Sequence, residues 1–164
     1  MQLKGFQVFK FRNIIDSGWV DVNTVSALVG QNECGKSNLL TALHLFSPYE
    51  KERKYDLRSD WPIDQWPPGS TDTVVCKTRF TLAAEEIAAL FEHAEPVAEV
   101  VADQAEPAKA KEARHDLPPA VDVTVERNYA NTYAIELPEA IATRLDEDKA
   151  TEWITSHLPK CVYM

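Results

Sequence analysis

The sequence has few cysteines and no long apolar run, and these shortages argue against several classes of protein. Its 164 residues include three cysteines, Cys34, Cys76 and Cys161, with no close-spaced pair and no histidine at the spacing of metal ligands. The pattern supports neither a disulfide framework nor a zinc site. No stretch approaches the roughly 20 apolar residues of a membrane span. We therefore expect a cytoplasmic protein with no membrane partner.

Positive charge is scarce as well. Lysine and arginine together number 17 against 26 aspartates and glutamates, which gives a formal net charge of −9. An acidic chain repels nucleic-acid phosphates unless its basic residues gather on one face. Lys4, Lys10 and Arg12 form a small basic cluster, which is either a solvated strand edge or a local DNA contact. General nucleic-acid binding by this chain alone is disfavoured.

Glycine is also rare, and two of the five glycines stand in one short motif, GQNECGKS, at residues 30–37. Gly30 and Gly35, five positions apart and followed by Lys36 and Ser37, match a phosphate-binding loop. Glycine dihedrals let successive backbone N–H groups converge on phosphate oxygens, and a following helix adds its positive dipole end. The lysine would reach the β- and γ-phosphates, and the serine would coordinate Mg²⁺. The motif predicts ATP and Mg²⁺ as cofactors.

The residues before this motif predict β-structure. Residues 2–13 alternate polar and apolar side chains, as in a strand, with apolar side chains on both faces. Residues 16–18 have turn chemistry and residues 19–22 form a short returning strand, which completes a β-hairpin. Residues 24–29 are apolar and β-branched, as in the central strand of a covered sheet. This last strand leads directly into Gly30.

The residues after the motif predict a helix. Leucines and Phe46 recur at spacings of three and four, and Pro48 ends the run. The order of strand, glycine loop and helix favours a nucleotide loop over a glycine-rich turn without ligand. Cys34 lies inside the loop and has no resolving partner, so we interpret it as a passive small residue.

The rest of the chain predicts a single α/β domain with an exposed insertion. Residues 95–119 consist mostly of Ala, Glu, Pro, Lys and Val, which bury little surface and favour an exposed, partly helical or disordered segment. The other expected features are an irregular connection at 49–72, a strand at 72–82, a helix at 83–94, two strands at 120–137 around a turn at 129–132, a helix at 138–158, and the opening of a strand at 159–164.

The segments LKGFQVFKFRNI and VSALVGQNECGKSNLLTALHLF, within residues 1–46, resemble a known family. They are similar to the N-terminal half of ABC-type ATPases of the SMC-like group, and most closely to the OLD (overcoming lysogenisation defect) ATPases and their relatives in bacterial antiphage systems. The resemblance implies a P-loop NTPase-type sheet with an antiparallel N-terminal hairpin. It also implies a role in DNA repair or phage defence, a homodimer or larger assembly, and DNA as a partner of the complete protein.

The resemblance also implies a set of site residues. Arg12 matches an arginine near the nucleotide phosphates, and Asn32 matches an asparagine near the γ-phosphate. Asn38, which follows Ser37, is assigned to the same cofactor site. Gln65 falls roughly where a Q-loop glutamine would sense Mg²⁺ and the attacking water, within the irregular sequence WPIDQWPPG.

Two parts of a hydrolysing ATPase of this family are missing. Such an enzyme needs an apolar strand ending in Asp-Glu and a Ser-Gly signature motif that closes over the γ-phosphate. The nearest candidate strand has too short an apolar run before Asp122, and no signature segment occurs. We therefore expect residues 1–164 to be the N-terminal part of an ATPase domain, an incomplete head that binds ATP without hydrolysing it alone.

Two other interpretations stay open. A small P-loop kinase or GTPase would use the loop by itself, but small kinases place it directly after their first strand and GTPases need an Asn-Lys-x-Asp motif, which is absent. A regulatory module would bind ATP only to order a partner interface. Turnover by an isolated monomer would indicate the first, and partner association that requires nucleotide would indicate the second.

Overall fold

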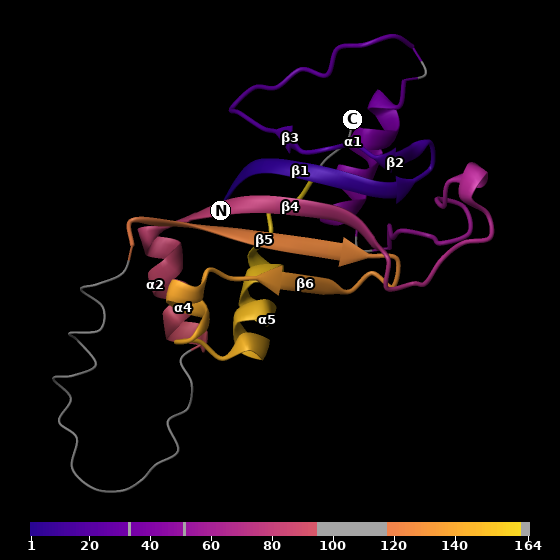
Figure 1. Ribbon diagram of the computed structural model, residues 1–164. Helices are drawn as coiled ribbons and strands as arrows, with labels where there is room; N and C mark the ends of the chain where they lie inside the picture. The colour runs from indigo at the N-terminus through magenta and orange to yellow at the C-terminus, as the bar shows by residue number, and fades with distance from the viewer. Residues whose placement is uncertain (33, 51, 95–117, 162–164) are drawn as a thin grey trace, which may run out of the picture.

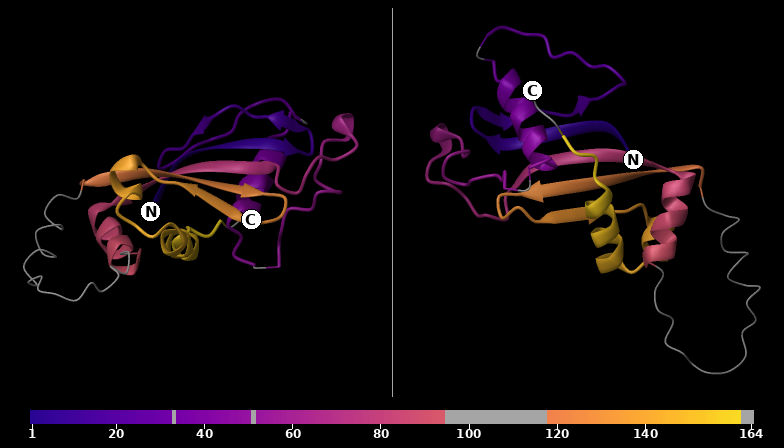
Figure 2. Two further views of the ribbon diagram at one scale, coloured as in Figure 1. Left: turned by 60° about the horizontal axis from the view of Figure 1, so that its bottom comes forward. Right: turned by 180° about the vertical axis from the view of Figure 1, so that it is seen from behind.

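A computed structural model describes residues 1–32, 34–50, 52–94 and 118–161. Within these residues the fold is α/β: an antiparallel six-stranded sheet in the order β2-β1-β4-β5-β6, with β3 also paired to β1 (Figure 1). Helices α1, α2 and α5 lie on one face of the sheet (Figure 2). The strands are β1 (Gln2–Phe11), β2 (Ile14–Asp16), β3 (Val20–Asp21), β4 (Val74–Ala83), β5 (Ala120–Asn128) and β6 (Tyr133–Glu136). The helices are α1 (Lys36–Phe46), the 3₁₀ turn η1 (Ile63–Gln65), α2 (Ala84–Ala94), α4 (Glu139–Ala142) and α5 (Glu147–His157).

Strand β1 forms as predicted, but only one of its faces joins the core. Phe6 and Val8 are buried, whereas Phe9 on the opposite face is only half-buried. Phe11 is also fully buried, because Lys10 adopts a left-handed conformation with φ of 49° that interrupts the alternation of side chains. The apolar side chains on both faces of β1 predict that both are buried, but the face that carries Phe9 is only half-buried there, because α1, α2 and α5 all lie on the other face (Figure 2).

The N-terminal hairpin is confirmed, but it turns earlier than predicted. The chain reverses at residues 12–13, and β2 then pairs antiparallel with β1 through Phe11 and Ile14. β3 continues the same return at the other end of β1. The predicted turn at residues 16–18 instead separates β2 from β3, where Asp16 accepts a hydrogen bond from the Gly18 amide at 2.8 Å.

Residues 24–29 do not form the predicted buried strand. They carry no regular structure, and Val25 and Val29 are 87% and 94% exposed. The physical reason lies in β1, because β4 occupies one of its edges while β2 and β3 occupy the other. A strand needs a neighbour for its backbone N–H and C=O groups. Residues 24–29 find none among the described strands and lie in an arch that leaves the sheet (Figure 1).

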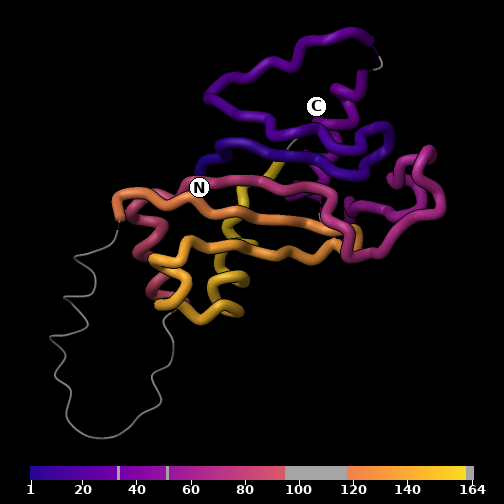
Figure 3. Tube along the Cα trace, in the orientation of Figure 1, coloured from indigo at the N-terminus to yellow at the C-terminus, as the bar shows by residue number. Residues whose placement is uncertain are grey.

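Strand β4 holds the sheet together, as its contacts with β1 and β5 are the most extensive of the fold. Helix α2 follows it directly, as predicted, and buries Ile87 and Leu90 against the sheet. The turn between β5 and β6 falls at the predicted residues 129–132 (Figure 3), and Asn131 within it has φ of 63°. Its side-chain amide exchanges two hydrogen bonds with the backbone of Tyr55, which anchors the irregular segment after α1.

The predicted helix at 138–158 is two helices, α4 and α5. Asp146 interrupts the helical run: its amide donates to the Ala94 carbonyl at the end of α2, and its carboxylate caps α5 by accepting from the Lys149 amide. Cys161 makes a parallel β-bridge with Pro48, in line with the expected start of a strand. Residues 95–117 of the expected insertion and residues 162–164 of that strand lie outside the described residues.

None of the helices that the structure describes has the length and apolar character of a membrane span.

The hydrophobic core lies between the sheet and the helices on one of its faces, and the charged side chain of Arg127 enters this core. Arg127 of β5 is 7% exposed and donates through one guanidinium nitrogen to the carbonyls of Leu45 and Phe46, the last residues of α1. The guanidinium also lies over the rings of Tyr55 and Tyr133. This arginine therefore supplies positive charge and hydrogen bonds at the carbonyl end of α1.

Replacing Arg127 with methionine is expected to lower the free energy of unfolding by about 2 kcal/mol, because a similar volume remains while two carbonyl groups lose a donor. The Leu45 carbonyl loses its side-chain donor, and the Phe46 carbonyl keeps the Tyr133 hydroxyl but loses the guanidinium. The measurement is urea unfolding followed by circular dichroism. Arg53→Met is the matched control, since Arg53 forms a solvent-exposed ion pair with Glu50, and a change within about 0.5 kcal/mol is expected there. Equal changes in both variants would contradict the capping role.

The exposure of residues 24–29 is tested by two isosteric substitutions. Val29→Thr is expected to change the free energy of unfolding by less than about 0.5 kcal/mol, because the side chain is already in water. Val125→Thr, in the buried part of β5, is expected to cost about 1–3 kcal/mol because it buries a hydroxyl group. A large loss from Val29→Thr would show that residues 24–29 are packed after all.

Candidate functional site

The motif loop ends where α1 begins, and this junction has the features of an anion site. Gly35 adopts φ of 95° and precedes Lys36, the first residue of the helix. Its carbonyl accepts the Leu39 amide at 2.8 Å, which closes the first helical turn. That turn has no side-chain cap and no acidic residue. The N–H groups and positive dipole end of α1 therefore face the loop, with no compensating carboxylate in the first turn of the helix.

Lys36 closes the loop with its ammonium group. The side chain folds back and donates to the carbonyls of Gly30 at 2.8 Å and Gln31 at 2.5 Å. The sulfur of Cys34, which is exposed, lies 3.5 Å from the same nitrogen. A cation thus stands at the mouth of the helix N-terminus, held by carbonyl groups that a stronger anionic ligand can replace.

A cavity of about 200 Å³ opens at this junction. Its wall contains most of the residues predicted for the site together with one that the sequence did not indicate: Asn13, Asn32, Gly35, Lys36, Ser37 and Asn38. Among the described lining residues none is acidic, and the amides at the start of α1 and the Lys36 ammonium are donors. Gly30 does not line the cavity, and it contributes through its carbonyl to Lys36. The geometry can hold a multiply charged anion.

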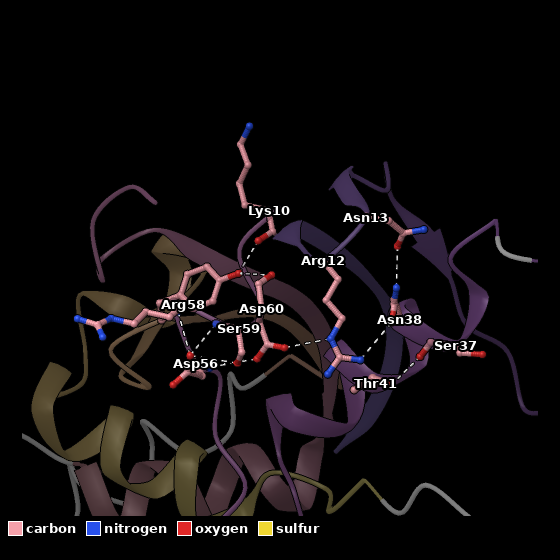
Figure 4. A network of polar contacts seen from close by, with 11 residues as sticks. Lys10, Arg12, Asn13, Ser37, Asn38, Thr41, Asp56, Arg58, Ser59 and Asp60 are labelled. Carbon is pink, nitrogen blue, oxygen red and sulfur yellow. Dashed lines mark hydrogen bonds and ion pairs between the residues drawn. The ribbon is translucent and has the colours of Figure 1, made fainter. Parts of the chain in front are cut away.

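Arg12 lies beside the cavity rather than in its wall. Its Nε donates to the carboxylate of Asp60 at 3.0 Å, and its NH1 donates to Asn38 Oδ1 at 3.2 Å (Figure 4). It lines a second cavity of about 470 Å³, together with residues that include Asp60, His44 and Lys54. Arg12 therefore connects the end of β1, the first turn of α1 and the segment that carries Asp60.

The turn that presents Arg12 is held in an unusual conformation. Lys10 and Arg12 both have positive φ, of 49° and 54°, which non-glycine residues adopt rarely. The Tyr129 hydroxyl donates to the carbonyl of Lys10 and, at 3.1 Å, to that of Asp60. Burial is the main cause that raises the pKa of Tyr129, so this hydroxyl stays protonated and keeps donating. Strained backbone held this firmly is a common feature of functional sites.

Asp60 is positioned by its own segment. Its carboxylate is buried and accepts the Asp56 amide at 3.1 Å, while its amide donates to the Asp56 carbonyl at 2.9 Å. Hydrogen bonds from the Ser59 amide and hydroxyl, and then from the Arg58 amide, lower the pKa of Asp56 below its ordinary value. The loop is therefore ordered around fixed carboxylates (Figure 4).

Gln65 lies outside this site. It ends the short turn η1, where its side-chain oxygen accepts from Lys10 Nζ and its carbonyl accepts from Trp61 Nε1. It lines neither of the two cavities described above. Asn13, by contrast, was missed because no motif includes it. The only sequence signal was its place directly after Arg12 in the turn of the hairpin.

Comparison with known proteins adds little to this geometry. No family model matches the chain, and no curated protein matches it. Among solved structures, the chain is similar to one described as "Structural biochemistry of ATP-driven dimerization and DNA stimulated activation of SMC ATPases". The TM-score is 0.42 and the sequence identity is 12%, over 95% of this chain and 79% of that chain. At these values the likeness supports no statement about shared chemistry.

The crowding at Gly35 gives a test of the loop geometry. A Cβ atom at this position would lie 3.1 Å from both amide atoms of Asn13. Gly35→Ala is therefore expected to lower the free energy of unfolding by about 2 kcal/mol, because a left-handed φ and a steric conflict add. Gly18→Ala is the matched control: φ there is 64° and nothing lies within 4 Å, so the expected cost is about 1 kcal/mol. Equal losses would contradict the close approach of Asn13.

Proposed function

We propose that this protein binds Mg-ATP through the loop at residues 30–38, with the phosphate chain in the cavity at the start of α1. The observation that carries the proposal is the coincidence of three features in one place. The uncapped N-terminus of α1, the Lys36 ammonium and a cavity whose described lining residues include no carboxylate all meet there. Each favours a polyphosphate, and together they match the chemistry that the sequence motif predicts.

The residues present also fit a magnesium ion. Ser37 lines the cavity, and its backbone carbonyl is engaged by the Thr41 hydroxyl at 2.7 Å, while no described hydrogen bond uses its own hydroxyl. A serine hydroxyl and phosphate oxygens are ligands that Mg²⁺ accepts. The ion would neutralise phosphate charge when bound. We assign Ser37 as its protein ligand and Gly30, Asn32, Gly35, Lys36, Asn38 and Arg12 to the nucleotide.

Hydrolysis by this chain alone is not part of the proposal. Activation of water for attack on the γ-phosphate needs a positioned polar or acidic group, and no aspartate or glutamate is among the residues that the structure describes in the cavity wall. We infer that residues 1–164 are the N-terminal part of an ATPase domain that acquires such a group from elsewhere. The unpaired, apolar residues 24–29 support this inference, because they have the composition of a strand and no described neighbour.

The wider role rests on the resemblance of residues 1–46 to SMC-like and OLD-family ATPases. We propose that the complete protein acts in DNA repair or phage defence and assembles as a dimer or larger complex. A nucleotide-dependent regulatory module is the second candidate, and the lack of a carboxylate among the described cavity residues favours it over a kinase or GTPase. ATP-dependent binding of a partner without any turnover after assembly would select the regulatory module.

The central prediction concerns Lys36. Isothermal titration with Mg-ATP is expected to give saturable heats for the unmodified chain, and Lys36→Ala is expected to weaken binding at least about 30-fold because it removes a charge-assisted contact with phosphate. Lys4→Ala is the control, since Lys4 is exposed and its ammonium group donates to the Gln2 side chain, away from the loop. Equal heats from the unmodified chain and Lys36→Ala would remove the nucleotide assignment.

A further inference from the structure

The amide of Asn13 is the one polar side chain in the cavity wall that belongs neither to the motif nor to helix α1. It extends from the hairpin turn after β1 and lies over Gly35, within 3.1 Å of the position that a Cβ would take there. Its role depends on which end of the amide faces the cavity. The hydrogen-bond chemistry of its neighbours decides that orientation.

A chain of four groups fixes the direction of every hydrogen bond. The buried Asp60 carboxylate can only accept, and a guanidinium can only donate, so Arg12 must donate to Asn38 through the Asn38 oxygen. The Asn38 nitrogen is then the atom that faces Asn13, and it donates to Asn13 Oδ1 at 2.8 Å. Reversing the Asn38 amide would place its NH₂ group against the arginine, which has no acceptor.

The hydrogen bond from Asn38 fixes which way the Asn13 amide points. Its oxygen is occupied by Asn38, so its nitrogen is turned away from Asn38 (Figure 4). No described hydrogen bond uses that nitrogen as a donor to another residue of the described chain. The side-chain NH₂ group of Asn13 is therefore a donor in the wall of the cavity. Its orientation is set by the hydrogen bonds that run from Asp60 through Arg12 and Asn38 to Asn13.

We propose that Asn13 is a nucleotide-binding residue whose NH₂ group donates to a phosphate oxygen of the bound nucleotide. The inference rests on the proposed function, because the acceptor it requires is the phosphate chain. It adds to the motif a contact from outside it, contributed by the strained turn after β1. The left-handed Arg12, whose backbone amide donates to the carbonyl of Asp60, holds Asn13 in this position.

The test compares three ligands and four variants by isothermal titration. The ligands are Mg-ATP, Mg-ADP and adenosine, and the variants are Asn13→Ala, Asn13→Asp, Lys36→Ala and Asn23→Ala. Asn23 is exposed, lies outside the cavity and serves as the matched control. Asn13→Asp is the decisive variant, because the carboxylate still accepts from Asn38 while the donor is lost and a negative charge faces the ligand.

Asn13→Ala is expected to weaken Mg-ATP binding about 10-fold through loss of one charge-assisted hydrogen bond. Asn13→Asp is expected to weaken it at least about 30-fold, more for Mg-ATP than for Mg-ADP, and less so at high salt, because repulsion between the carboxylate and phosphate is screened. Asn23→Ala is expected to match the unmodified chain. A purely structural role would instead leave Asn13→Asp unchanged or weaken all nucleotides by one factor.

The outcomes separate the two proposals. If the unmodified chain binds Mg-ATP, Lys36→Ala abolishes binding and Asn13→Asp stays within twofold of the unmodified chain, the role of Asn13 is wrong while the nucleotide loop stands. If the unmodified chain does not bind Mg-ATP, both proposals fall. A second readout is the side-chain NH₂ resonance of Asn13, which is absent in Asn13→Asp. Its chemical shift is expected to move when Mg-ATP is added, and an unmoved resonance would overturn the contact.

Discussion

The contact between Arg12 and the buried carboxylate of Asp60 is the interaction on which the rest of the site depends. It joins three segments that are distant in sequence: the end of β1, the first turn of α1 through Asn38, and the irregular connection before η1. Because an aspartate can only accept and an arginine can only donate, this pair also sets the direction of the hydrogen bonds that follow it. Asp60 therefore orients the amides in the cavity wall although it does not itself line the cavity.

Helix α1 is fixed at both ends by side chains from the sheet. At its C-terminus, the guanidinium of Arg127 meets the last carbonyls, where positive charge complements the helix dipole. At its N-terminus, Asn13 and Arg12 hold Asn38, while the backbone N–H groups stay uncapped. A helix anchored in this way presents its amides in a fixed direction, so little ordering remains to be done when an anion binds.

The N-terminal hairpin has two structural roles, and the second requires strained backbone. It completes the sheet beside β4, and it also brings two side chains to the mouth of the loop, which requires left-handed backbone at Lys10 and Arg12. Tyr129, the residue directly after β5, stabilises this strained turn through the hydrogen bonds of its hydroxyl with the carbonyls of Lys10 and Asp60. The same occupation of both β1 edges leaves residues 24–29 without a place in the sheet, although their composition suits one. The β-propensity of residues 24–29 favours a strand, but the described sheet has no free edge beside β1 with which they could pair.

Local signals in the sequence determined the elements themselves. Alternation predicted β1, the segments at 72–82 and 120–137 were predicted as the strands β4 to β6, the leucine spacing with Pro48 predicted α1, and the glycines with Lys36 predicted a phosphate loop before it. These features depend on residues close in the chain, so a single sequence carries them. Three outcomes were decided only by tertiary structure: the exposure of residues 24–29, the split between α4 and α5 at Asp146, and the place of Asn13 in the cavity wall. Each depends on which distant groups are available as partners, and no spacing within the sequence encodes that.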